Sequence, residues 1–95
     1  MQFLVTARDG TDGEALSRRM KVRPQHLENM AKLKEEGHVI CAGGLLDGDG
    51  RLAGSFLAME FENREMLDAY LAEEPYVTGD VWRDIVVETC NVVIR

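Results

Sequence analysis

Several residue types that would mark a special class of protein are scarce in this chain of 95 residues. It has two cysteines, Cys41 and Cys90, which lack the Cys-x-x-Cys spacing of zinc sites and redox motifs. A disulfide framework is not indicated either, because such frameworks use several cysteines in a small secreted chain. Both cysteines stand in apolar, strand-like segments, so we expect two buried free thiols.

The chain also lacks long apolar runs and an excess of basic residues. No stretch approaches the length of a membrane span, and residues 1–9 have neither the basic start nor the apolar run of a signal peptide. Eleven basic against seventeen acidic side chains give a net charge of −6. Because this charge opposes nucleic acid and anionic lipid, we expect neither nucleic acid nor membrane as a partner. The lack of a signal peptide and of a membrane span favours a cytoplasmic protein.

Motifs that hold cofactors or metals are absent as well. The sequence contains no Gly-x-Gly-x-x-Gly, no Walker loop, no His-Glu-x-x-His and no clustered metal-ligand spacing. The acidic turn Asp47-Gly48-Asp49-Gly50 has too few ligands for a calcium loop and no glutamate at the required position. We therefore predict that the protein uses no cofactor and no metal.

What is present is the composition of an ordinary globular domain. Hydrophobic residues make up 45% and charged residues 29% of the chain, far from the composition of disordered proteins. A chain of this length forms one domain, and we assign residues 1–95 to it.

Hydrophobic patterning and turn signals predict the order β-α-β-β-α-β. Strands are expected over residues 2–8, 38–46, 55–61 and 85–94, with a reversal at residues 47–50. A capping box of Thr11 and Glu14 precedes a short helical turn, and Pro24 begins a second helical segment that Gly37 ends. Asn63 caps a further helix that Pro75 ends, and residues 76–82 are expected to form a loop.

This order is typical of the ferredoxin-like α+β fold, an antiparallel sheet with both helices on one face. The opposite face is open, and we expect Leu57 and Met59 to be apolar residues exposed there. A second copy of the chain is the simplest cover for such a face. We therefore predict a homodimer with sheets packed face to face.

Two segments carry candidate chemistry. His26 is expected in the first turn of a helix, where the helix dipole disfavours the imidazolium and keeps a neutral base available; an exposed capping histidine is the alternative. Glu73 and Glu74 are expected at a helix C-terminus, where carboxylates are electrostatically misplaced unless a cation or imidazole is near; the alternative is that both side chains are simply exposed. His38 is expected to be solvated.

A cluster of basic residues surrounds His26. It could attract a small carboxylate or phenolate, or it could simply be a solvated helix face. Its members are Arg18, Arg19, Lys21, Arg23, Lys32 and Lys34.

Four short segments, in this order and spacing, resemble the YciI-like (YCII-related) family over essentially the whole chain. They are Arg23-Pro24-Gln25-His26-Leu27, Ala42-Gly43-Gly44, Gly54-Ser55 and Glu74-Pro75-Tyr76. The resemblance implies a ferredoxin-like fold that dimerises into an α+β barrel, and an active site built from a histidine and an aspartate. Some relatives eliminate chloride from chloroaromatic compounds without a cofactor.

Carried over to this chain, the resemblance implies that His26 is the catalytic acid or base and that Glu74, in place of the family's aspartate, orients it. Arg23 would bind an anionic group, Ser55 would donate a hydrogen bond, and Tyr76 would form the pocket wall. The implied activity is elimination, dehydrochlorination or isomerisation of a small anionic or aromatic compound. The alternative is a non-catalytic dimeric module that binds a small ligand or a protein, because fold alone does not decide function.

Overall fold

The computed structural model describes all residues from Met1 to Arg95. Its elements follow the predicted order, with one short additional helix. They are β1 (Gln2–Asp9), α1 (Ala15–Glu35), β2 (Val39–Leu46), β3 (Leu52–Glu60), α2 (Arg64–Glu73), α3 (Pro75–Thr78) and β4 (Trp82–Cys90). The helix α3 replaces part of the loop expected over residues 76–82, and β4 begins and ends earlier than the expected strand over residues 85–94.

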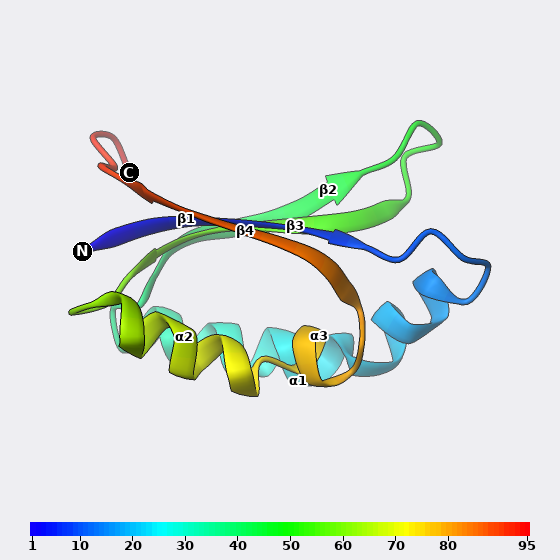
Figure 1. Cartoon of the computed structure of the whole chain (residues 1–95), viewed down its shortest axis with the longest axis horizontal. Helices are drawn as coiled ribbons and strands as arrows, with labels where there is room; N and C mark the ends of the chain where they lie inside the picture. The colour runs from blue at the N-terminus through cyan, green and yellow to red at the C-terminus, as the bar shows by residue number, and fades with distance from the viewer.

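The four strands form one sheet in the order β2-β3-β1-β4, and every neighbouring pair is antiparallel. All three helices lie against the same face of this sheet, and the other face is uncovered within the chain (Figure 1). The arrangement confirms the ferredoxin-like α+β fold. None of the helices is long and apolar enough to cross a membrane, and the cytoplasmic location stays a prediction.

The helix α1 runs unbroken through Pro24, so the predicted division into two helical segments is wrong. Proline removes one backbone hydrogen bond and usually kinks a helix. Here the buried residues Arg19 and His26 lie on either side of Pro24 and both form hydrogen bonds to other elements. Tertiary contacts on both sides of Pro24 therefore keep α1 helical through this residue in spite of the local preference.

The ends of the helices agree in part with the predicted signals. The capping box of Thr11 and Glu14 is not formed; instead the Asp12 carboxylate accepts a hydrogen bond from the backbone N–H of Glu14. Gly37 follows α1 with a positive φ of 86°, as its stop signal predicted. Asn63 caps α2 by accepting a hydrogen bond from the Met66 N–H.

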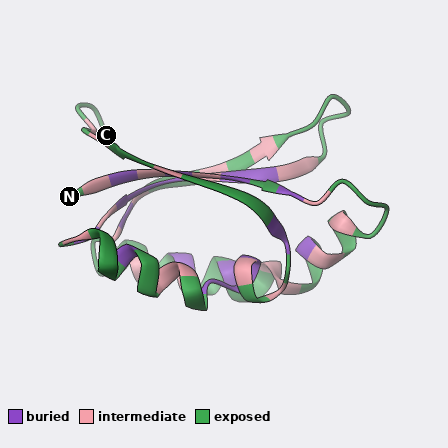
Figure 2. Cartoon of the chain, in the orientation of Figure 1, coloured by how far each residue is buried: buried purple, intermediate pink, exposed green.

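The core lies between the helices and the inner face of the sheet (Figure 2). Leu57 and Met59 belong to this core, with 1% and 0% of their surfaces exposed, so their predicted place on the open face is wrong. The register pairs Leu57 with Val5 and Met59 with Phe3, which also face the helices. Because successive side chains of a strand point to opposite faces, the β3 residues on the open face are the alternate ones, such as Phe56 and Ala58.

The expected burial of both cysteines is also wrong for the single chain. Cys41 is exposed and Cys90 is half-buried. The reason is that β2 is an edge strand, and Cys41 pairs with Ala58 and shares its place on the open face. The free state of both thiols agrees with the prediction.

We expect Leu57→Ala to lower the free energy of unfolding by about 2–5 kcal/mol, because it leaves a cavity beneath the helices. Urea denaturation followed by circular dichroism measures the change. Leu46→Ala is the matched control, since Leu46 is 60% exposed and its truncation should change stability by no more than about 0.5 kcal/mol. Equal effects of the two substitutions would contradict the assignment of Leu57 to the core.

Candidate active site

A pocket of about 240 Å³ opens between α1 and the β2–β3 half of the sheet. Four of the five predicted site residues line it: Arg23, His26, Ser55 and Tyr76. The remaining lining residues are Arg19, Leu27, Met30, Ala42, Gly43, Gly44, Leu52, Phe56 and Leu57. Glu74, the fifth predicted residue, lies behind His26 with none of its surface exposed.

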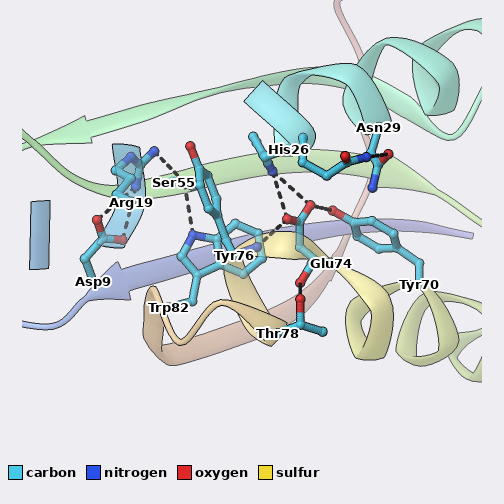
Figure 3. A network of polar contacts seen from close by, with 11 residues as sticks. Asp9, Arg19, His26, Asn29, Ser55, Tyr70, Glu74, Tyr76, Thr78 and Trp82 are labelled. Carbon is cyan, nitrogen blue, oxygen red and sulfur yellow. Dashed lines mark hydrogen bonds and ion pairs between the residues drawn. The ribbon is translucent and has the colours of Figure 1, made fainter. Parts of the chain in front are cut away.

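The predicted contact between His26 and Glu74 is present. Nδ1 of His26 lies 2.9 Å from both carboxylate oxygens of Glu74, although the two residues are 48 positions apart (Figure 3). His26 comes from the middle of α1, and Glu74 joins α2 to α3. The extra methylene of glutamate, relative to the aspartate implied by the resemblance, therefore does not prevent the contact.

Glu74 is held by its own segment as well. Its carboxylate caps α3 by accepting a hydrogen bond of 2.7 Å from the Tyr76 backbone N–H, and it accepts a second one of 2.6 Å from the Tyr70 hydroxyl. The expected misplacement at the end of α2 is thus resolved, because the same residue begins the next helix, where a carboxylate is favourable. Burial and the neighbouring Glu74 raise the pKa of Tyr70, so its hydroxyl stays protonated and remains a donor.

The hydrogen bonds of Glu74 determine which nitrogen of His26 is free. An ionised carboxylate only accepts hydrogen bonds, so Nδ1 of His26 must carry a proton and donate it. Nε2 has no partner in the chain and is not among the fully buried polar atoms that lack one, which are Nε of Arg18 and of Arg19. In neutral His26 the basic lone pair is therefore on Nε2, which is reached from the pocket.

Two aromatic residues fix the orientation of the imidazole. The Tyr76 ring stacks on His26 with centroids 4.0 Å apart, and Trp82 meets it edge-on at 6.2 Å. The predicted influence of a helix N-terminus on His26 is wrong, because a helix dipole acts mainly within the first turn and His26 lies far inside α1. The environment of His26 is set by Glu74 and by these rings instead.

A second buried polar group, which the motifs did not reveal, lies beside the first. Nη1 of Arg19 lies 3.1 and 3.0 Å from the two carboxylate oxygens of Asp9. Nη2 of Arg19 donates to the Ser55 hydroxyl at 3.0 Å, and Trp82 Nε1 donates to the same oxygen at 3.1 Å. Arg19 precedes His26 by seven positions, which places both on one face of a helix; this spacing was the available signal.

The predicted basic cluster does not act as one surface. Arg18 pairs with Asp12, and Lys21, Lys32 and Lys34 are exposed on the outside of α1. Arg23 lines the pocket, and no carboxylate of the chain lies within ion-pair distance of it. Since no acidic side chain lines the pocket either, the pocket favours an anionic ligand in a chain of negative net charge.

The second histidine, His38, lies outside the pocket. His38 is half-buried rather than solvated; its Nδ1 contacts the Glu60 carbonyl at 2.9 Å and its ring stacks on Phe61. No group of three or more His, Cys, Asp or Glu side chains is placed to hold a metal ion.

The fold and the pocket define a ferredoxin-like α+β protein in which a buried histidine–carboxylate pair lies behind a small cationic pocket. The model of the YCII-related domain matches residues 1–91. The chain belongs to this family, as the resemblance of its motifs predicted.

Comparison with individual proteins agrees with this assignment. The chain is 31% identical to protein YciI of Escherichia coli O6:H1, over 93% of this chain and 94% of that protein. It is 29% identical to an uncharacterized protein of Haemophilus influenzae, with the same coverage of both chains.

Solved structures share the fold to different degrees. The 5-chloro-2-hydroxyhydroquinone dehydrochlorinase TftG of Burkholderia phenoliruptrix AC1100, in complex with 2,5-dihydroxybenzoquinone, superposes with a TM-score of 0.86 at 25% identity, covering 96% of this chain and 94% of TftG. An antibiotic biosynthesis monooxygenase superposes with a TM-score of 0.56 at 18% identity, covering 99% of this chain and all of that one. The second similarity is one of fold alone.

We expect Tyr70→Phe to destabilise the protein at neutral pH by about 1.5–3 kcal/mol, because the buried Glu74 carboxylate loses a donor. Above pH ~10 an unfolded tyrosine ionises, whereas folded Tyr70, with its raised pKa, does not. Ionisation of Tyr70 in the unfolded state then lowers the unfolding free energy of the parent by up to about 1.4 kcal/mol per pH unit. The variant has no tyrosine at this position, so its unfolding free energy does not fall for this reason. Denaturation curves from pH 7 to 11 should show the gap between parent and variant narrowing above pH 10. A constant gap would contradict the proposed role of the Tyr70 proton.

Proposed function

We propose that the protein is a small enzyme that needs no cofactor and uses His26 for proton transfer on a small anionic or aromatic compound. In this proposal Nε2 of neutral His26 takes a proton from the substrate, and Glu74 stabilises the imidazolium that forms. The reaction class is elimination, dehydrochlorination included, or isomerisation. Arg23 binds an anionic group of the substrate, Ser55 donates a hydrogen bond and Tyr76 forms the wall.

The observation that carries this proposal is the arrangement of donors around Glu74. Three groups, the His26 Nδ1–H, the Tyr70 hydroxyl and the Tyr76 N–H, donate to one fully buried carboxylate. This leaves the basic nitrogen of His26 on the pocket side. A structural ion pair would not require the second nitrogen to be open to a pocket, so the geometry favours an acid–base role over a purely structural one.

The size of the pocket suits a single ring. A cavity of about 150 Å³ accommodates benzene, and drug-sized ligands need about 300–1,000 Å³. The pocket volume of about 240 Å³ lies between these values. The similarity to TftG, whose known complex contains a ring compound, supports the same class of substrate.

Chloride release from 5-chloro-2-hydroxyhydroquinone tests the proposal, with solvent-deuterium exchange of substrate protons as a second readout. We expect His26→Gln to lower kcat by about 10²- to 10⁴-fold, since it removes the general base, while binding of 2,5-dihydroxybenzoquinone persists. His38→Gln is the matched control, because His38 lies outside the pocket, and it should leave kcat unchanged.

The same experiment separates the enzyme from the alternative. A parent protein that binds the quinone but neither releases chloride nor exchanges protons would favour a non-catalytic binding module. Equal turnover by the parent and His26→Gln would remove His26 from the mechanism.

We also propose that the chain forms a homodimer through the open face of its sheet. Within one chain that face is free of helices (Figure 1), and it carries Leu4, Phe56 and Val86. Apolar residues on an uncovered sheet face favour association. A second copy packed on it would also cover Cys41.

We expect Leu4→Asp to convert the dimer to a monomer, because an unpaired charge buried in an interface costs several kcal/mol. Light scattering measures the mass, and the rate of maleimide labelling at Cys41 should rise in the variant. Met66→Asp is the control, since Met66 is exposed on α2 at the helical side. A parent protein that is monomeric at micromolar concentration would contradict the proposal.

A further inference from the structure

The hydroxyl of Ser55 has an unusual set of partners. Its oxygen accepts hydrogen bonds from Arg19 Nη2 and from Trp82 Nε1, at 3.0 and 3.1 Å. A serine hydroxyl has one proton and two acceptor positions, and guanidinium and indole groups only donate. Both acceptor positions of Ser55 are therefore occupied, and neither partner can take its proton.

The Ser55 proton has no acceptor elsewhere in the chain, and the residue lines the pocket. Only 3% of the Ser55 surface is exposed, so bulk solvent reaches the hydroxyl only through that pocket. The proton is thus available to a bound molecule on the same side as Nε2 of His26.

Buried charge holds this arrangement in place. Asp9 and Arg19 are 7% and 3% exposed, and the carboxylate contacts the guanidinium through both of its oxygens. The Arg19 guanidinium also lies over the Tyr76 ring, 4.6 Å from its centroid. A buried ion pair is weak evidence for stability, because desolvation offsets its attraction. Its geometric effect is clearer: Arg19 has little freedom to turn away from Ser55 (Figure 3).

The other polar groups of the pocket are donors as well. Arg23 has no carboxylate partner in the chain, and burial raises the pKa of Tyr76, so its hydroxyl keeps its proton. Apart from Nε2 of His26 and the Tyr76 hydroxyl oxygen, which accepts as well as donates, no side chain lining the pocket offers an unoccupied strong acceptor.

We propose that Asp9, Arg19 and Trp82 make Ser55 a fixed hydrogen-bond donor, and that the position beside it selects an oxyanion or carbonyl oxygen over a neutral hydroxyl. Asp9, Arg19 and Trp82 are positioning residues, because they act on the ligand through Ser55. The inference rests on the proposed function for its chemistry, and it narrows the substrate class to enolisable carbonyl compounds and phenolates.

The electron flow is balanced in such a substrate. Nε2 of His26 forms a bond to a proton as the C–H bond beside the carbonyl breaks. The C–H electron pair becomes a C=C bond, and the C=O pair moves to the oxygen, which accepts the Ser55 proton in a hydrogen bond. Arg19, one hydrogen bond further away, stabilises the negative charge that develops there. Return of the pair expels a leaving group with its electrons or places the proton on another carbon.

Binding of 4-nitrophenol tests the polarity of this position, because its absorbance distinguishes phenol from phenolate. We expect the parent protein to bind the phenolate more tightly than the phenol, which lowers the pKa of the bound compound below that of the free one. Ser55→Ala should weaken phenolate binding by about tenfold or more and bring that pKa back towards the free value. Ser17→Ala is the matched control, since Ser17 is exposed on α1, and it should change neither quantity.

Trp82→Phe gives an independent test that keeps the ring packed against His26. It frees one acceptor position of Ser55, so the preference for phenolate over phenol should shrink. Equal affinities for phenol and phenolate in the parent, no phenolate binding at all, or an unchanged preference in Ser55→Ala would each overturn the inference.

The outcome is separable from that of the proposed function. His26→Gln should keep the preference for phenolate, because the preference depends on Ser55. A parent protein that prefers phenolate but shows no turnover would contradict the proposed enzymatic function and would support the donor role of Ser55.

Discussion

The site and the helical layer both depend on the hydrogen bonds of one buried carboxylate, that of Glu74. A charge with no exposed surface is costly to bury unless hydrogen bonds replace its hydration. Glu74 obtains those bonds from His26 on α1, Tyr70 on α2 and the backbone at the start of α3. The three helices are therefore tied at a single point. Any shift of one helix relative to the others would leave the carboxylate short of a donor.

The same constraint gives His26 its chemical character. The carboxylate takes the Nδ1 proton, and the stacked Tyr76 ring limits rotation of the imidazole. A base whose tautomer and orientation are already set loses little entropy when it meets a substrate. The hydrogen bonds that replace the lost hydration of Glu74 thus also fix the tautomer and orientation of His26, the residue proposed for catalysis.

A second buried charge, the guanidinium of Arg19, has the opposite sign to Glu74 and lies on α1 seven positions before His26. Arg19 is neutralised by Asp9 and reaches Ser55, so α1 carries a cation and a histidine on the same buried face. Between them the pocket presents one base and several donors. Such a combination fits proton abstraction beside an oxygen that becomes negative, and this is why the pocket supports an enzyme better than a passive binding module.

Much of the fold could be predicted from local patterns. The order of the strands and helices, the Asn63 cap and the stop at Gly37 follow from short-range preferences, and they agree with the structure. The faces of β3 could not be predicted, because apolar residues occur on both of its sides and only the register with β1 shows that Leu57 points to the helices. The continuous helix through Pro24 could not be predicted for a related reason, since the contacts of Arg19 and His26 outweigh the tendency of proline to interrupt a helix.

The site shows the same division between sequence and tertiary structure. The motifs around His26, Ser55 and Glu74 identified the family, which the family model confirms. They also pointed to His26 and Glu74, which the structure brings into contact. They gave Asp9 no role, placed Arg19 only in the basic cluster, and gave no indication of the free nitrogen of His26 or of the groups that direct the Ser55 proton. These properties depend on hydrogen bonds between residues 48, 36 and 27 positions apart. Only packing of the helices on the sheet brings such donors and acceptors together, so the tertiary structure alone decides which group donates and which accepts.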